Sequence, residues 1–232
     1  MRTIWVYSNI ALWTLIFGLG SYFTILLTGK KKYFRFFANI WGKTLSLIFN
    51  INLVIEGEEN LEKNKNYIFA ANHSSFIDIP LLCVACKRYL VFVAKSELKK
   101  IPIFKSILDR AGFVFVDRKN NDNAVNSMNI LINDISREPR SVGIFPEGTR
   151  SRDGVLKKFK KGAAVMAINT RIPVIPVFIS GSYEWSQKSF FDLTRSTIKF
   201  QFSEPIDSKN FSYEQRQSFT DLIRSKVEGM KK

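Results

Sequence analysis

The chain has 232 residues, enough for one sizeable domain with its own hydrophobic core. Its hydrophobic fraction is 46% and it contains 21 phenylalanines, a composition that argues against an intrinsically disordered chain. Lysine and arginine total 35 against 20 acidic residues, a formal net charge of +15, so we expect a polyanionic neighbour: nucleic acid, an anionic membrane surface or a phosphorylated substrate.

The chain opens with an apolar run, Thr3–Gly29, that contains no charged side chain. A helix of that length can cross a bilayer, which takes about 20 residues. The cluster Lys30–Lys32 follows directly, and the positive-inside rule would place it at the cytoplasmic headgroups. A cleaved signal peptide is the competing interpretation, but the run has no small-x-small cleavage site. Because Gly18 and Gly20 could bend the helix, a full span and a membrane-dipping hairpin both remain open.

The next segment, Tyr33–Asn52, is predicted to form a second helix. Its polar residues recur at steps of three and four, and bulky apolar residues cover the rest of its surface. It is either a core helix of the domain or a helix in the membrane interface, with a thin polar stripe facing water or protein. Its position after an apolar run and a lysine cluster favours the interface. We therefore expect a membrane anchor over residues 1–52 and a separate folded domain over residues 53–232.

After Asn52, short β-branched and aromatic runs alternate with helical patterns. The predicted strands are Leu53–Glu56, Tyr67–Ala71, Leu90–Ala94, Phe113–Val116, Val142–Phe145, Val174–Ile179 and Thr197–Phe202. The predicted helices are Ile77–Cys86, Ile101–Arg110, Asn123–Arg137, Lys161–Asn169 and Tyr213–Met230. This alternation is typical of an α/β domain whose mostly parallel sheet is covered by helices.

The two cysteines, Cys83 and Cys86, lie in one of these apolar helical stretches. With a single histidine in the chain, they are too few to form the four-ligand site that zinc prefers. Small buried thiols are common in such stretches. The chain shows no disulfide framework, which fits a reducing compartment.

Three polar clusters follow predicted strands: Asn72-His73, Asp117-Arg118 and the run from Pro146 to Arg150. In open α/β sheets, ligands and catalytic groups gather beyond the carboxyl ends of the strands. If these strands are neighbours in the sheet, the three clusters converge on one site.

His73 is the only histidine, and Asp78 follows it five positions later. A carboxylate bonded to one ring nitrogen would fix the tautomer and leave the other nitrogen free to accept a proton. Alternatively, Asp78 only favours the dipole of the following helix and His73 only fills a turn. No serine or cysteine nucleophile motif such as GxSxG accompanies the pair, so a general base without a covalent intermediate is the natural functional hypothesis.

The third cluster places an acid, a glycine, a hydroxyl and a guanidinium in four consecutive residues, Glu147–Arg150. Arginine binds phosphate in a bidentate manner, and Gly148 allows the backbone to approach a ligand closely. Arg118 at the second cluster either binds phosphate as well or pairs with an acid such as Asp117 or Glu147.

Four blocks occur in order along the chain: NHSSFID (Asn72–Asp78), GFVFVDR (Gly112–Arg118), FPEGTRS (Phe145–Ser151) and IPVIPV (Ile172–Val177). Together they resemble the motifs of the glycerophospholipid acyltransferases, in particular the bacterial 1-acylglycerol-3-phosphate acyltransferases. The stretch Lys95–Leu98 resembles a further shared segment. The resemblance covers about half of the chain, and one position departs from the usual pattern, with Val116 in place of isoleucine.

That resemblance implies that residues 53–232 are an acyltransferase domain in which His73 is the general base and Asp78 its orienting partner. The substrate-binding residues that it implies are Lys95, Arg118, Glu147, Gly148, Thr149, Arg150 and Pro176. Of these, Pro176 is expected to shape the wall for the acceptor or the acyl chain.

The implied reaction transfers a fatty acyl group from an acyl thioester to the sn-2 hydroxyl of 1-acylglycerol-3-phosphate, giving phosphatidate at the cytoplasmic face of the inner membrane. It implies no metal or tightly held cofactor, and leaves acyl-CoA and acyl carrier protein open as donors. The alternatives are the same chemistry on glycerol-3-phosphate or a lyso-aminolipid, and a non-catalytic lipid-binding protein of the same fold. A nucleic-acid partner is not expected, because the sequence lacks nucleic-acid-binding motifs.

Overall fold

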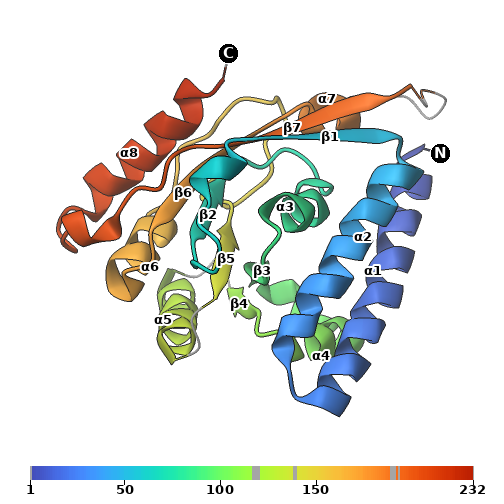
Figure 1. Cartoon of the computed structure of the whole chain (residues 1–232), viewed down its shortest axis with the longest axis horizontal. Coiled ribbons are helices and arrows are strands. Elements are labelled where there is room, and N and C mark those ends of the chain that lie inside the picture. Colours follow the sequence, from blue (N-terminus) through green and yellow to red (C-terminus); the bar gives the residue numbers. More distant parts are fainter. Residues whose placement is uncertain (1, 117–120, 138–139, 189–191, 193, 232) are drawn as a thin grey trace.

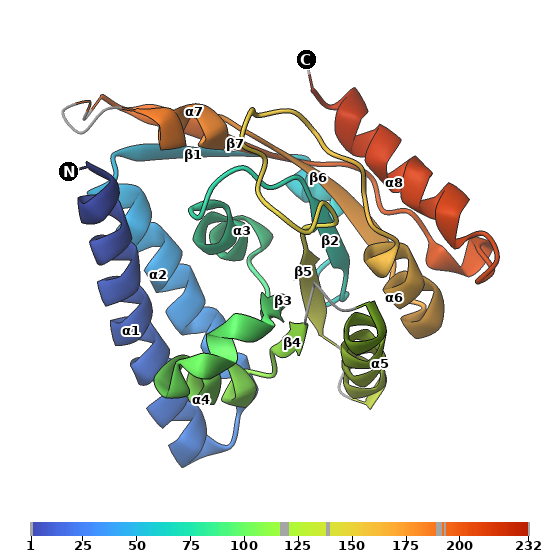
Figure 2. The same cartoon turned by 180° about the vertical axis from the view of Figure 1, so that it is seen from behind.

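The computed structural model describes residues 2–116, 121–137, 140–188, 192 and 194–231. Within these residues, a seven-stranded sheet has the order β1-β7-β6-β2-β5-β3-β4, and helices cover both of its faces (Figures 1 and 2). The strands are β1 (Ile51–Glu56), β2 (Ile68–Ala71), β3 (Leu90–Lys95), β4 (Val114–Val116), β5 (Ser141–Ile144), β6 (Val174–Ser180) and β7 (Ser196–Phe202). All seven predicted strands are present. The sheet is mostly parallel, as predicted, because only β6 and β7 pair antiparallel.

The helices are α1 (Arg2–Thr28), α2 (Phe34–Ile48), α3 (Asp78–Cys86), α4 (Pro102–Arg110), α5 (Asn121–Arg137), α6 (Gly162–Thr170), α7 (Ser182–Gln187) and α8 (Arg216–Gly229). The five helices predicted after residue 52 are confirmed, with ends that differ by a few residues. The short helix α7 was not predicted. Its six residues are too few to show a helical period, so no sequence pattern indicates it.

The core lies on both faces of the sheet. Along β2 and the residue before it, Tyr67, Phe69 and Ala71 belong to one buried cluster, while Ile68 and Ala70 belong to the other. Helices α2 and α3 cover the first cluster, and α5, α6 and α8 cover the second. Because both faces of the central strands are buried, their sequences are continuous apolar runs and do not alternate between apolar and polar residues.

Helix α2 packs closely against α3. Ala38, Gly42 and Leu45 are its buried residues, and a Cβ added to Gly42 would lie 2.3 Å from the carbonyl oxygen of Pro80. The polar stripe predicted for this helix is therefore not continuous on the surface, because Gly42, which belongs to it, is buried in the contact with α3. The outward face exposes Phe36 and Leu47, so α2 is a core helix on one side and apolar surface on the other.

Helix α2 is also shorter than predicted. It ends at Ile48, and Asn50 adopts the left-handed region with a φ of 50°, which turns the chain into β1 at Ile51. Asparagine is one of the few residues that tolerates this conformation.

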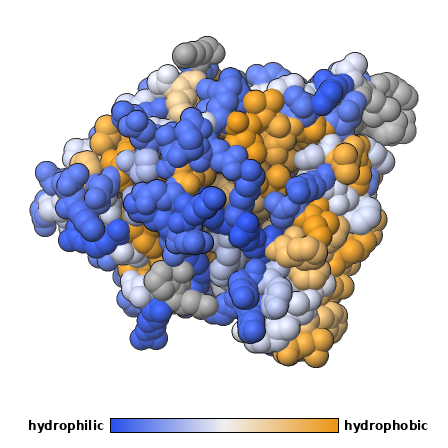
Figure 3. All heavy atoms as spheres, in the orientation of Figure 1, coloured by the Kyte–Doolittle hydropathy of each residue, from blue (hydrophilic) through white to orange (hydrophobic). Residues whose placement is uncertain are grey.

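Helix α1 is long and apolar enough over Ile4–Thr28 to cross a membrane, by length and composition. It packs against α2 and α4 along one side and leaves large apolar side chains such as Ile4, Leu12 and Phe23 exposed. The guanidinium of Arg110 on α4 lies 4.9 Å from the ring centroid of Tyr22. Figure 3 shows hydrophobic residues gathered on the side of the molecule where α1 and α2 lie. Helices α1 and α2 are thus packed onto the domain that they precede.

Gly42 provides a test of the α2–α3 contact. We expect Gly42→Ala to lower the free energy of unfolding by about 1–3 kcal/mol, because the added methyl group overpacks a backbone contact. Gly229→Ala is the matched control, since this helical glycine has nothing within 4 Å of the added Cβ. Thermal unfolding in detergent should separate the two variants, and equal melting temperatures would contradict the close contact.

Candidate active site

The carboxyl ends of β2, β5 and β6 meet at one edge of the sheet. These three strands are adjacent and parallel, with Ala70 in register with Ile144 on one side and Pro176 on the other. Beyond this edge, the side chain of Asn72 accepts the N–H of Ile179 at 2.7 Å and donates to its carbonyl at 2.8 Å. That pair of bonds continues the contact between β2 and β6 past the end of the strand, and it fixes the residue before His73.

The predicted histidine–aspartate pair is present. His73 Nδ1 lies 2.8 Å from Asp78 Oδ2, and Asp78 is fully buried at the first residue of α3. The same oxygen accepts the backbone N–H groups of Ser74 and Ser75, each at 2.8 Å. Asp78 therefore lies at a helix N-terminus, and it also bonds the imidazole, so a role at the helix alone does not describe it.

This geometry assigns the tautomer of His73. A carboxylate oxygen that already accepts two backbone N–H groups acts as an acceptor towards the ring, so Nδ1 carries the hydrogen. In the neutral imidazole Nε2 is then unprotonated and able to accept a proton. The ring stacks on Phe145 with centroids 4.1 Å apart, and the residue is 9% exposed. A ring held in one plane and one tautomer suits a general base.

Glu147 has a different position from the one implied for a substrate ligand. Its Oε1 accepts the N–H of His73 at 2.9 Å, and its Oε2 accepts the N–H of Lys157 at 3.1 Å. The side chain is buried, and burial raises the pKa of the carboxyl group above its usual value although the two backbone N–H groups oppose the shift. Glu147 thus ties the loop after β2 to the loop after β5.

Two further contacts define the shape of the FPEGTRS loop. The N–H of Ser151 donates to the carbonyl oxygen of His73 at 2.7 Å. Gly148 has a φ of +73°, where a side chain would be strained and a Cβ would lie 3.1 Å from Lys160 Cε. Its neighbour Thr149 is exposed, as is Arg150. The loop therefore turns its acid inwards and its hydroxyl and guanidinium outwards.

Arg150 lies over the ring of Phe76, with its guanidinium carbon 3.4 Å from the ring centroid. Phe76 in turn meets Tyr7 of α1 edge to face, with centroids 5.0 Å apart. Among the described residues, no carboxylate pairs with Arg150. The arginine is held in place by a cation–π contact that leaves its donors available to an anion.

A cleft of about 790 Å³ opens beside this group. It is lined by Val6, Tyr7, Ser74, Ser75, Phe76, Thr149, Arg150, Ser151, Arg152, Lys157, Trp185, Ser186, Gln187 and Lys188. Four of these residues are cationic and none is acidic. The cleft reaches the residues that directly follow His73, and its walls come from α1, α7 and the two loops.

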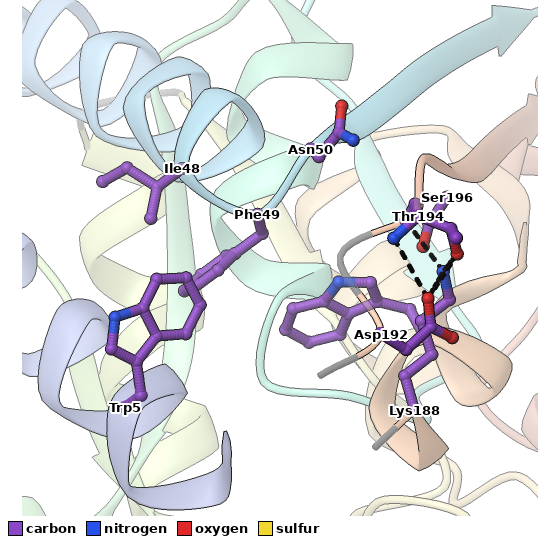
Figure 4. A pocket seen from close by; sticks show the side chains of 9 residues that line it. Trp5, Ile48, Phe49, Asn50, Lys188, Asp192, Thr194 and Ser196 are labelled. Atoms are coloured by element: carbon purple, nitrogen blue, oxygen red, sulfur yellow. Dashed lines mark hydrogen bonds and ion pairs between the residues drawn. The ribbon is translucent and has the colours of Figure 1, made fainter. Parts of the chain in front are cut away.

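A smaller cavity of about 200 Å³ adjoins the cleft and shares Trp185 and Lys188 with it. Figure 4 shows Trp5 and Phe49 on one side of this cavity, and Lys188, Asp192 and Thr194 on the other. Trp185 is buried and lies 5.3 Å from Phe49, centroid to centroid. The position of α7 relative to the cleft is therefore fixed by core packing.

The remaining predicted site residues fall elsewhere. Arg118 and Asp117 lie outside the described residues, and so does the side chain of Lys95, whose backbone ends β3 at the same edge of the sheet. Pro176 is buried inside β6 between β2 and β7, and it is not among the residues that line the cleft. Its contacts with the neighbouring strands make it part of the packed sheet.

Sequence reasoning missed the aromatic groups of the site. Phe76 lies within the NHSSFID block, so its proximity to the site was foreseeable although its contact with Arg150 was not. For Tyr7, in the apolar run at the start of the chain, no sequence signal pointed to the site.

Comparison with known proteins identifies the family. A sequence model described as acyltransferase matches residues 52–180. A 1-acyl-sn-glycerol-3-phosphate acyltransferase of Saccharomyces cerevisiae is 28% identical over 214 residues, which cover 91% of this chain and 70% of that protein. An enzyme of the same name from Borreliella burgdorferi is 31% identical over 180 residues, covering 76% of this chain and 70% of its own.

A solved structure agrees with these sequence matches. The crystal structure of the 1-acyl-sn-glycerophosphate acyltransferase PlsC from Thermotoga maritima aligns with a TM-score of 0.76 and 29% identity. The alignment covers 100% of this chain and 98% of that one, so it includes the two amino-terminal helices as well as the sheet. The family match spans β1 to β6 and both loops of the site. The chain therefore belongs to the acyltransferase family and is an enzyme of that class.

Proposed function

We propose that this enzyme transfers a fatty acyl group from an acyl thioester to the sn-2 hydroxyl of 1-acylglycerol-3-phosphate. The observation that carries the proposal is the His73–Asp78 pair at the sheet edge, beside a cationic cleft that contains Arg150. The names of the yeast and Borreliella relatives support the same acceptor. A phosphate-bearing acceptor also suits the four cations and the absence of acids among the residues that line the cleft.

In the proposed reaction, His73 Nε2 removes the proton from the acceptor hydroxyl as its oxygen attacks the thioester carbonyl. The C–O bond forms, the C–S bond breaks, and the proton on the imidazole passes to the departing sulfur. Asp78 stabilises the imidazolium that forms between these steps and holds the ring in place. Because a thioester is already reactive, the scheme needs no enzyme nucleophile, metal or bound cofactor. Arg150 holds the acceptor phosphate, and this positioning supplies part of the rate enhancement.

The proposed place of reaction is the surface of a membrane, at the cytoplasmic face of the inner membrane. Helix α1 and the outward face of α2 present exposed apolar side chains, and Lys30–Lys32 follow the apolar helix. Lysines at that position favour the cytoplasmic headgroups. Since Tyr7 of α1 also lines the cleft, an acceptor whose acyl chain stays in the bilayer would lie close to the site.

Substitution of the base is the first test. We expect His73→Gln to reduce kcat by about 10²–10⁴-fold, because glutamine retains a donor for Asp78 but cannot accept the proton. His73→Ala should lose at least as much activity. Thiol release from an acyl thioester by the purified, membrane-reconstituted enzyme is the measurement. Substantial transfer to lysophosphatidate by either variant would rule out His73 as the base.

Substitution of the phosphate ligand is the second test. We expect Arg150→Gln to raise KM for lysophosphatidate by about 10- to 100-fold, the worth of a charge-assisted hydrogen bond, and to change KM for monoacylglycerol little. Phe76→Leu removes the ring under the guanidinium and should raise the same KM about 2- to 5-fold.

The matched control for this test is Arg216→Gln, which removes another arginine stacked on an aromatic ring, 4.4 Å from Tyr213 near the start of α8. This variant should keep wild-type kinetic constants. If Arg150→Gln raised KM equally for lysophosphatidate and monoacylglycerol, Arg150 would not be the ligand of the acceptor phosphate.

A further inference from the structure

The cleft carries more positive charge than one acceptor phosphate requires. Arg150, Arg152, Lys157 and Lys188 all line it, with no acidic side chain among the lining residues. A phosphate monoester carries at most two negative charges. The volume of the cleft, about 790 Å³, lies in the upper range of ligand sites, which span roughly 300–1,000 Å³. Both charge and volume leave room for a second anionic ligand.

The four cations are not equivalent. Lys157 Nζ donates to the carbonyl oxygen of Arg150 at 3.1 Å, so it supports the loop. Lys188 Nζ donates to the carbonyl and the hydroxyl of Thr194, at 2.9 and 2.7 Å, and forms an ion pair with Asp192 Oδ1 at 3.5 Å. Arg150 rests on Phe76. Arg152 is exposed, and within the described part of the chain it has neither a hydrogen bond nor an ion pair. It is a second guanidinium open to an anion in the same cleft.

We propose that Arg152 binds the phosphate of the 4′-phosphopantetheine group of the acyl donor, in the cleft that the polar end of α7 also lines. The inference rests on the proposed function, because it assigns the second substrate of that reaction. Coenzyme A and acyl carrier protein both carry this group, so the assignment covers either donor. It adds α7 and Arg152 to the site, neither of which belongs to the loop's FPEGTRS block.

The chemistry of the two substrates separates their phosphates. In the acceptor, the phosphate is bonded to the carbon next to the one that carries the reacting hydroxyl, so it must bind close to His73. In the donor, an arm with two amide groups lies between the phosphate and the sulfur. The donor phosphate must therefore bind farther along the cleft when the thioester carbonyl is beside His73 Nε2.

The walls of the cleft match such an arm. Ser186 and Gln187 supply a hydroxyl and an amide, which are suitable partners for the amide groups of pantetheine. Trp185 anchors this wall, because it is buried and packs against Phe49. The smaller cavity of Figure 4 shares Trp185 and Lys188 with this wall of the cleft.

The test compares donors that carry the same acyl chain: acyl-CoA, acyl carrier protein, acyl-4′-phosphopantetheine and acyl-pantetheine, which lacks the phosphate. For Arg152→Gln we expect KM for the first three donors to rise about 10-fold, as for loss of a charge-assisted hydrogen bond. For acyl-pantetheine, KM of the variant should be less than about 2 times KM of the wild type. KM for the acceptor should not change. Lys158→Gln is the matched control, since this exposed lysine lies outside the cleft lining.

Three outcomes would overturn the inference. An equal penalty for all four donors would show that Arg152 does not sense the donor phosphate. A penalty that depends on the acceptor phosphate would place both arginines on the acceptor. A penalty confined to acyl-CoA would assign Arg152 to the nucleotide phosphates and not to the arm.

A second measurement needs no variant. Free 4′-phosphopantetheine should inhibit the wild-type enzyme competitively with the donor at a concentration about 10-fold lower than pantetheine does. Equal inhibition by the two compounds would contradict the proposal. Because both measurements compare donors at one acceptor, they hold for any hydroxyl that the enzyme acylates. Failure to acylate lysophosphatidate while the donor comparison succeeds would therefore remove the proposed acceptor and leave the donor site standing.

Discussion

One carboxylate oxygen, Asp78 Oδ2, organises the centre of this enzyme. It accepts the N–H groups of Ser74 and Ser75 and the Nδ1–H of His73, all at 2.8 Å. The two backbone bonds fix the turn that leads into α3, and the third fixes the ring. The same interaction therefore begins a helix, sets a tautomer and leaves Nε2 as the acceptor.

A second buried acid explains why the cleft is so positive. Glu147 directs both oxygens to backbone N–H groups, so it neutralises none of the arginines that follow it in the loop. Asp78 is likewise turned away from the cleft towards the imidazole and the backbone. With the nearby acids engaged inside the protein, Arg150 and Arg152 face the cleft without a carboxylate partner among the described residues. The positive charge is thus available to anionic substrates.

The amino-terminal helices contribute to the site as well as to the exposed apolar surface. Tyr7 meets Phe76, which supports Arg150, and Trp5 meets Phe49, which packs against Trp185 of α7. One helix therefore reaches both Arg150, to which we assign the acceptor phosphate, and the wall that we assign to the donor. A shift of α1 would therefore change the geometry of the cleft.

The sequence by itself determined the seven strands, the mostly parallel sheet, the apolar first helix and the His73–Asp78 pair, because these depend on local periodicity and on short motifs with fixed spacing. It did not determine the inward turn of Glu147, the burial of Pro176 within β6, or the split character of α2, since each depends on which backbone or helix lies opposite. The contact between Tyr7 and Phe76 joins residues 69 positions apart, and α7 has no pattern of its own. Only the tertiary structure decided these features, because strand order and helix packing select the neighbours that side chains meet across long stretches of chain.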